Sequence, residues 1–196
     1  MIKLGKWIKQ TFDTLVDPDR DANIQELHDK IYYDVHQLKD QFELSTSIRE
    51  FPCTAKHVEM AKELVYRSII AHHWKKGRLN DRQREVAKWL AKKLELAASR
   101  AAEINVEFAR SAFAEALGVA MEDGELDARE IHYLEEISAS AGMQLATFAR
   151  TFFRIEGERF LRGMFLSAIE DGVLEDDERK TLVEVTRRLG LSEAEL

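Results

Sequence analysis

Apolar residues recur at three- and four-residue steps along most of the chain, which is the spacing of one face of an α-helix. Strict apolar–polar alternation is absent, and Ala, Leu, Glu, Lys and Arg, which favour helices, dominate the sequence. The only prolines are Pro18 and Pro52, so no proline interrupts the chain from Thr54 onward. The pattern therefore predicts an all-α protein. The predicted helices span Ile24–Glu43, Ala55–Lys75, Asp81–Ala97, Ala102–Met121, Ala128–Ser140, Leu145–Phe153, Glu158–Glu170 and Asp176–Leu189.

Three stretches of the chain align without gaps at a spacing of about 48 residues, marked by Gly77, Gly124 and Gly172. The third residue after each glycine is an Asn, Asp or Glu that directly precedes the next predicted helix. The sixth residue after each glycine is a Gln or Glu. These pairs are Asn80 with Gln83, Asp127 with Glu130, and Glu175 with Glu178. Such spacing predicts capping boxes, which satisfy the free amides at a helix start. Each stretch is thus expected to form a helix, a tight glycine turn and a capped second helix.

Other aligned positions give the turns and helix ends a predicted role. Leu79, Leu126 and Leu174 are expected to turn inward and hold the loops against the core. Gly142 and Gly190 fall where a helix C-cap needs a left-handed residue. Glutamate is a poor N-cap, so Asp176 rather than Glu175 is expected to cap the last helix.

These patterns predict a compact helical bundle over residues 54–196, built from three helix–turn–helix repeats at about 66–97, 113–143 and 161–191. Residues 1–51 form a predicted N-terminal helical extension, whose apolar stripe must be buried against this domain or a second copy. The stripe consists of Ile24, Leu27, Ile31, Val35, Leu38 and Phe42.

Both ends of the chain carry helix signals. Residues 1–16 are amphipathic, which favours a terminal helix packed on its own domain and leaves a membrane-surface anchor as the alternative. Ser192–Glu195 is a capping box, so we expect either a helix cut short or a vestigial turn. No secretory signal and no apolar run near the ~20 residues of a membrane span is found. The expected location is cytoplasmic, or peripheral at the inner face of the membrane.

Charge is unevenly distributed about a net value of −7. Residues 1–65 carry −3, residues 66–113 carry +6 and residues 114–196 carry −10. The basic part contains a candidate anion-binding stripe within residues 75–93, formed by Lys75, Lys76, Arg84, Lys88 and Lys92. The stripe has three interpretations: contact with phosphates of a membrane or nucleic acid, a solvated face, or pairing with acidic parts of the chain. The acidic net charge counts against nucleic acid.

Two acidic segments, Met121–Glu130 and Ile169–Glu178, resemble the paired motifs of TerB-like domains. That family includes tellurite-resistance proteins and the membrane-proximal domain of a DnaJ-like co-chaperone. The resemblance covers about Asn105–Leu196, and Lys75-Lys76 replace the acidic pair in the first repeat. It implies an all-helical TerB-like fold, acidic residues suspected of binding a metal ion, and a role in bacterial stress response.

The acidic turns supply a candidate metal site. Its residues are Glu122, Asp123, Asp127, Glu130, Glu170, Asp171, Glu175 and Glu178. With glycine at position 6 of a calcium-binding loop, carboxylates occupy positions 5, 9 and 12, but Val119 and Met121 stand at positions 1 and 3. A single-loop site is therefore disfavoured. One interpretation is a divalent cation, Ca²⁺ or Mg²⁺ rather than Zn²⁺, shared between two turns. The other is helix capping by some carboxylates and solvation of the rest.

Catalytic motifs are missing from the sequence: it has no Gly-rich phosphate loop, no Gly-x-Ser-x-Gly and no His-Glu-x-x-His. Cys53, the only cysteine, and His57 are too few ligands for zinc. We expect a non-enzymatic protein-interaction or scaffold module with a protein partner, or a second copy as the alternative. A cation-responsive domain and an anion-binding domain using the basic stripe are the competing functions.

Overall fold

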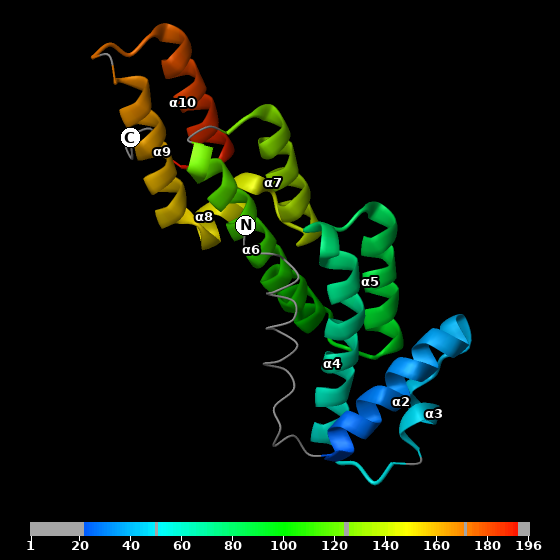
Figure 1. Ribbon diagram of the computed structural model, residues 1–196. Coiled ribbons are helices and arrows are strands. Elements are labelled where there is room, and N and C mark those ends of the chain that lie inside the picture. The colour runs from blue at the N-terminus through cyan, green and yellow to red at the C-terminus, as the bar shows by residue number, and fades with distance from the viewer. Residues whose placement is uncertain (1–21, 50, 124–125, 171, 192–196) are drawn as a thin grey trace. The chain divides into compact units, whose positions relative to one another are not determined.

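The computed structural model describes residues 22–49, 51–123, 126–170 and 172–191, with the backbone alone at Asp123. In these ranges all regular secondary structure is helical and no strand is present (Figure 1), which confirms the predicted all-α class. The elements are α2 (Ala22–Leu38), η1 (Lys39–Gln41), α3 (Leu44–Ile48), α4 (Ala55–His73), η2 (Trp74–Lys76), α5 (Asp81–Lys93), α6 (Ala98–Asp123), α7 (Ala128–Ser140), α8 (Leu145–Phe152), α9 (Arg154–Ala168) and α10 (Asp176–Arg188).

The chain divides into two compact units, Met1–Phe108 and Ala109–Leu196. This division falls within α6 and not near residues 52–53, where the sequence placed a boundary. The reason is that α2 packs along α4, so the predicted extension and the helix after it share one core.

The first helix of the described chain ends earlier than its apolar stripe predicted. Lys39 adopts a left-handed backbone conformation with φ 48°, and α2 stops at Leu38 instead of Glu43. The Leu38 side chain is consequently 40% exposed, whereas Phe42, beyond the turn, is buried in the core with 1% of its surface exposed. A residue at the end of α5 stabilises this turn. The Lys93 ammonium donates to the carbonyl oxygens of Asp40 at 2.6 Å and Phe42 at 3.2 Å.

A charged network joins α4 to the beginning of α6 in the first unit. The Arg67 guanidinium binds both carboxylate oxygens of Glu107, at 2.6 and 3.1 Å, and its Nε donates to Glu63 at 2.9 Å. Glu63 also accepts two hydrogen bonds from Arg100, at 2.7 and 2.8 Å. Arg67 is buried, and a buried guanidinium is tolerated when its donors are paired.

The aromatic core of the first unit lies beside this network. Trp74 stacks on Phe108, and its indole N–H donates to Asn105 at 3.3 Å. The Asn105 side-chain amide in turn donates to the Tyr66 hydroxyl at 2.8 Å. The polar atoms of both large aromatic residues are thereby satisfied inside the core.

Three helices end with the same local geometry. After α5, α7 and α10, the residues Glu95, Gly142 and Gly190 all have positive φ, at 49°, 76° and 68°. The next amide in each case donates to the carbonyl five residues earlier, at 2.9 to 3.0 Å, as in a Schellman cap. The two glycine caps were predicted, and the left-handed Glu95 was not.

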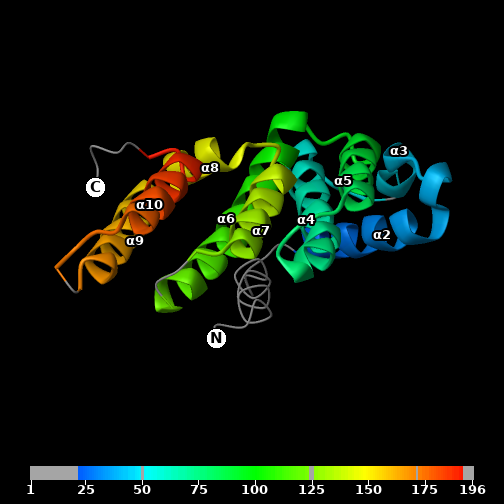
Figure 2. The same ribbon diagram turned by 90° about the horizontal axis from the view of Figure 1, so that it is seen from above.

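The second unit is built around aromatic side chains from α6 and α8. Phe113 lies 5.3 Å from Phe148 and 4.7 Å from Phe153 between ring centroids. The Arg110 guanidinium covers the ring of Phe152 at 5.1 Å. Around this centre, α9 and α10 lie side by side in both views (Figures 1 and 2), joined by a turn in which Gly172 has φ 86°.

None of the described helices combines the length and the apolar character that a bilayer crossing requires. The predicted amphipathic helix of residues 1–16 and the capping box Ser192–Glu195 lie outside the described residues.

Two glycines of the second unit should respond oppositely to alanine. A Cβ on Gly190 would meet the Ala146 carbonyl oxygen at 2.6 Å, in a left-handed conformation that itself costs alanine about 1–2 kcal/mol. Gly163 lies inside α9, and a Cβ there meets nothing within 4 Å. We expect Gly190→Ala to destabilise the fold by at least about 2 kcal/mol and Gly163→Ala to stabilise it by about 0.5–1 kcal/mol. Chemical denaturation measures both, and a tolerated Gly190→Ala would contradict the described packing.

The network of the first unit predicts a pH dependence. Hydrogen bonds from Arg100 first, and also from Arg67, hold the pKa of Glu63 below its ordinary 4.5 despite partial burial, which opposes them. The stabilisation from a lowered pKa is complete above pH 4.5 and is lost as the pH falls through the folded-state pKa. Glu63→Gln should therefore cost about 1–3 kcal/mol at pH 7, and its deficit should shrink below pH 4.5.

Urea denaturation at pH 7 and at low pH measures that deficit. The matched control is Glu85→Gln on α5, where an exposed carboxylate pairs with the exposed Lys88, so a change within about 0.5 kcal/mol is expected. A Glu63→Gln deficit that is the same at both pH values would rule out this role of the carboxylate.

Candidate functional site

The acidic turns of the second unit begin helices. Asp127 Oδ1 accepts hydrogen bonds from the backbone amides of Arg129 at 2.7 Å and Glu130 at 2.8 Å. Glu130 in return accepts from the Asp127 amide at 2.9 Å, which completes the predicted capping box. The Asn80–Gln83 box at the start of α5 is also confirmed, with both bonds at 2.9 Å. These carboxylates therefore satisfy backbone donors that would otherwise be free.

The third turn departs from the prediction at one position. Helix α10 begins at Asp176 with Glu175 as its N-cap, and the Glu175 amide donates to Glu178 Oε2 at 2.9 Å. The expectation that Asp176 would be the N-cap was thus wrong. The leucines of the three turns were predicted to point inward. Leu79 and Leu126 are buried, and Leu174 is half-buried.

Of the candidate metal ligands, Glu122, Glu170 and Glu175 are exposed. The side chain of Asp123 and the whole of Asp171 lie outside the described residues. Among the side chains that are described, no group of three or more His, Cys, Asp or Glu is arranged to hold a metal ion. A cation shared between Glu122, Asp123, Glu170 and Asp171 stays a prediction, because two of these four carboxylates lie outside the described residues.

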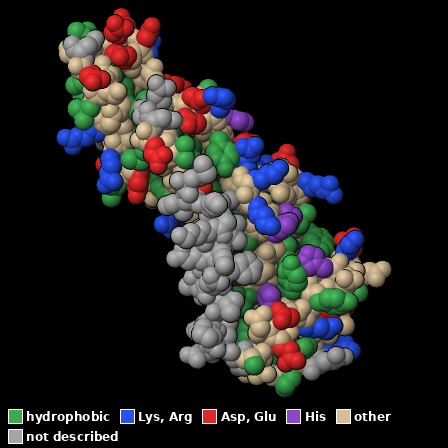
Figure 3. Space-filling view, viewed as in Figure 1, with side chains coloured by type: hydrophobic (Ala, Val, Ile, Leu, Met, Phe, Trp, Pro, Cys, Tyr) green, Lys and Arg blue, Asp and Glu red, His purple; other side chains and the backbone are tan. Residues whose placement is uncertain are grey.

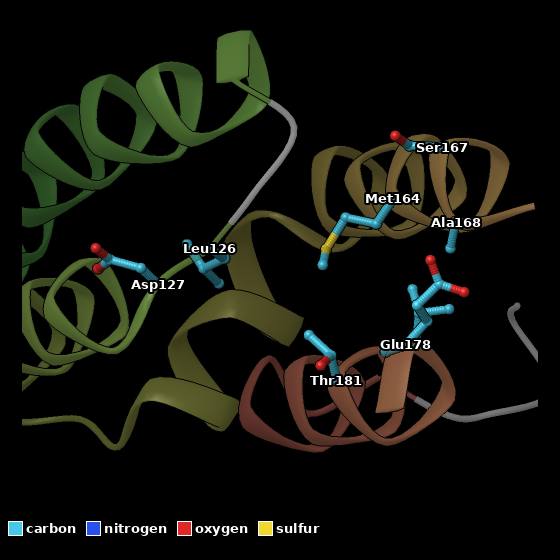
Figure 4. A pocket seen from close by; sticks show the side chains of 8 residues that line it. Leu126, Asp127, Met164, Ser167, Ala168, Glu178 and Thr181 are labelled. Atoms are coloured by element: carbon cyan, nitrogen blue, oxygen red, sulfur yellow. The ribbon is translucent and has the colours of Figure 1, made fainter. Parts of the chain in front are cut away.

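Two of the eight acidic candidates, Asp127 and Glu178, line a common groove of about 440 Å³ in the second unit (Figure 4). The groove runs between the start of α7 on one side and the pair α9 and α10 on the other. Its lining residues are Leu126, Asp127, Met164, Ser167, Ala168, Glu178, Thr181 and Leu182.

The floor of the groove is apolar. Leu126 and Leu182 are buried, with exposed fractions of 6% and 3%, while Met164 and Ala168 are half-buried. Met164 and Ala168 form one apolar stripe of α9 together with Phe160, at the four-residue spacing of a helix face. Phe160 is indeed buried, but toward the end of α9 the same stripe is only partly covered. An apolar strip that can receive another side chain is left accessible there.

The two carboxylates differ in direction (Figure 4). The Asp127 side chain is turned toward the beginning of α7, which it caps, whereas the Glu178 carboxylate is turned toward α9 across the groove. Hydrogen bonds from the Glu130 amide first, and also from the Arg129 side chain, keep the pKa of Asp127 below its ordinary value. Glu178 Oε2 accepts the Glu175 amide, and no hydrogen bond from the described residues engages its Oε1.

The hydroxyl groups at the groove are oriented by their own helix. The Thr181 hydroxyl donates to the Asp177 carbonyl at 2.9 Å, so its oxygen remains an acceptor. No nucleophile–base pair is formed by the lining side chains, which are apolar, hydroxyl or carboxylate groups. The arrangement can hold an apolar group and a cation next to each other, which is a binding function.

The basic stripe lies in the first unit, and Arg84 and Lys88 are engaged by partners at their own helix. Arg84 donates to the Leu79 carbonyl at 3.0 Å and pairs with Asp81. Lys88 pairs with Glu85 at 2.8 Å. Lys75, Lys76 and Lys92 are exposed. The stripe is therefore partly neutralised within its own helix, and anion binding there stays a prediction.

Comparison with family models, curated proteins and solved structures finds no match for this chain. The TerB-like resemblance thus depends on the two acidic segments alone. The function has to be argued from the geometry of the site.

The Asp127 cap predicts a second pH effect. Because the pKa of Asp127 is lowered in the folded chain, its contribution is present above the ordinary value of 3.8 and is lost as the pH falls through the folded-state pKa. Asp127→Asn keeps a capping oxygen but cannot titrate. We expect its thermal midpoint to fall less than that of the wild type between pH 5 and pH 3. Asp127→Ala, which lacks the oxygen, should have a lower midpoint already at pH 7; equal acid dependence in the wild type and Asp127→Asn would contradict the assignment.

Proposed function

We propose that this chain is a non-enzymatic protein-interaction module of TerB-like type, and that the groove between α7, α9 and α10 is where a partner protein docks. The single observation that carries the proposal is an open groove with an apolar floor and a carboxylate directed across it. Binding sites for other molecules are concave, mostly apolar and provided with a few placed polar groups. The groove matches that description.

Local geometry supports the TerB-like, three-repeat interpretation of the fold. The starts of α5, α7 and α10 carry the aligned capping pairs, and their ends share the left-handed residue and the long-range amide bond. Gly77 and Gly172 also share positive φ in the turns before α5 and α10. The stress-response role comes from the resemblance alone and is part of the same proposal.

The competing functions have weaker support from the described residues. A cation site would need several carboxylates whose oxygens face one ion, whereas Asp127, Glu130 and Glu178 bind helix-start amides. Anion binding would need free cations on one face, whereas Arg84 and Lys88 are paired. A protein segment requires neither, because it can contact the apolar floor directly.

Site-specific photo-crosslinking in the producing cell tests the docking proposal. A diazirine amino acid is placed at Thr181, which lines the groove, or at Thr151 on α8, which does not. The two positions are matched, because both are exposed helical threonines whose hydroxyl donates to the carbonyl four residues earlier. We expect a discrete protein adduct from position 181 and none from position 151.

A blocking variant decides whether such an adduct depends on the groove. Ser167→Lys adds a bulky cation to the exposed last turn of α9, where a positive charge favours the helix. The adduct from position 181 should disappear in this variant while the thermal midpoint is kept. An adduct that persists, or equal adducts from positions 181 and 151, would refute docking in the groove.

A further inference from the structure

We infer that the segment received by the groove is basic and apolar: a short stretch of a partner protein in which a Lys or Arg stands within a few residues of a large apolar side chain. This inference rests on the proposed docking function and adds the chemistry of the partner.

The apolar half of the recognition follows from the floor. Met164 and Ala168 from α9 and Leu126 before α7 line the groove (Figure 4). Methionine adapts its shape to different apolar neighbours. A volume of about 440 Å³ lies within the range of pockets that hold ligands. An aliphatic or aromatic side chain would therefore be the anchor.

The cationic half follows from Glu178. Its carboxylate is turned across the groove toward α9, next to the apolar floor (Figure 4). One oxygen accepts the Glu175 amide. Since none of the described residues donates to the second oxygen, an incoming donor can bind there. A Lys or Arg placed there would form a charge-assisted hydrogen bond, and an Asp or Glu would face a like charge.

The surroundings of the groove select the same sign of charge. The second unit contains 10 Lys and Arg against 19 Asp and Glu, a net charge of −9. Acidic side chains gather at the end of this unit where α9 leads into α10 (Figure 3). Their exposed members include Glu170, Glu175, Asp176 and Asp177. Such a field attracts cationic segments and repels anionic ones before contact, which also argues against a phosphorylated segment or an anionic membrane.

The test uses three short fluorescein-labelled peptides and the full chain. In the first, leucines stand beside lysines; in the second, glutamates replace the lysines; in the third, serines replace the leucines. Fluorescence anisotropy gives each dissociation constant. We expect the first peptide to bind at least about tenfold more tightly than either of the others, and its affinity to fall as salt is raised.

Two matched variants localise the binding. Thr181→Lys places a cation in the groove and should weaken the first peptide at least about tenfold through like-charge repulsion. Thr151→Lys makes the same change on α8 and should leave the affinity unchanged. Shifts of the Met164 methyl NMR signal on addition of the first peptide identify the groove directly.

Each outcome bears on the inference separately from the proposed function. Equal binding of the three peptides, equal effects of Thr181→Lys and Thr151→Lys, or an unmoved Met164 methyl would overturn the basic–apolar assignment. If the groove-dependent adduct at position 181 were still obtained, docking would stand and only the partner chemistry would be wrong. Displacement of the first peptide by Ca²⁺ or Mg²⁺ but not by matched Na⁺ would instead make the groove a cation site and overturn both.

Discussion

The helix pairs of this chain depend on hydrogen bonds that satisfy the backbone where each second helix begins. At the starts of α5, α7 and α10, an amide and a side chain three residues apart bind each other across the first turn. Unpaired amides at those points would be costly. The same carboxyl and amide groups that make the turns conspicuous in the sequence are therefore needed to form them. This is why an acidic motif in such a turn is weak evidence for a metal and good evidence for a helix start.

The two units use charge in different ways. In the first, Glu63, Arg67 and Glu107 are combined in one network that joins α4 to α6, so much of the charge serves the fold. In the second, acidic side chains are exposed at the end of the α9–α10 pair, and one carboxylate is directed over an apolar floor. The second unit is accordingly the one whose surface is suited to selecting a partner.

Periodicity and capping chemistry are local, and what depends on them could be predicted. The helical class, the Asn80 and Asp127 boxes and the glycine C-caps all follow from residues within a few positions of one another. The end of α2 could not be predicted, because Lys93, about fifty residues away along the chain, holds the carbonyls of the turn.

The groove could not be predicted either, for a related reason. Met164 and Ala168 have the spacing of core residues, and only the distance between α9, α10 and the start of α7 leaves them half-covered. Glu178 was selected from the sequence, but as a metal ligand beside seven others. Its position across an apolar floor is a property of tertiary packing, which the order of residues does not reveal.

The central claim is that an apolar strip of α9 is open to an incoming side chain in solution. Solvent paramagnetic relaxation of methyl groups by an inert gadolinium chelate measures this most directly, with two internal references on the same helix. Leu166 is 57% exposed and Leu161 is fully buried. We predict that the Met164 methyl relaxes at a rate between those of the two leucines and is protected when the basic–apolar peptide is added. A Met164 methyl as protected as Leu161 in the free protein would mean that the groove is closed, and would contradict the account.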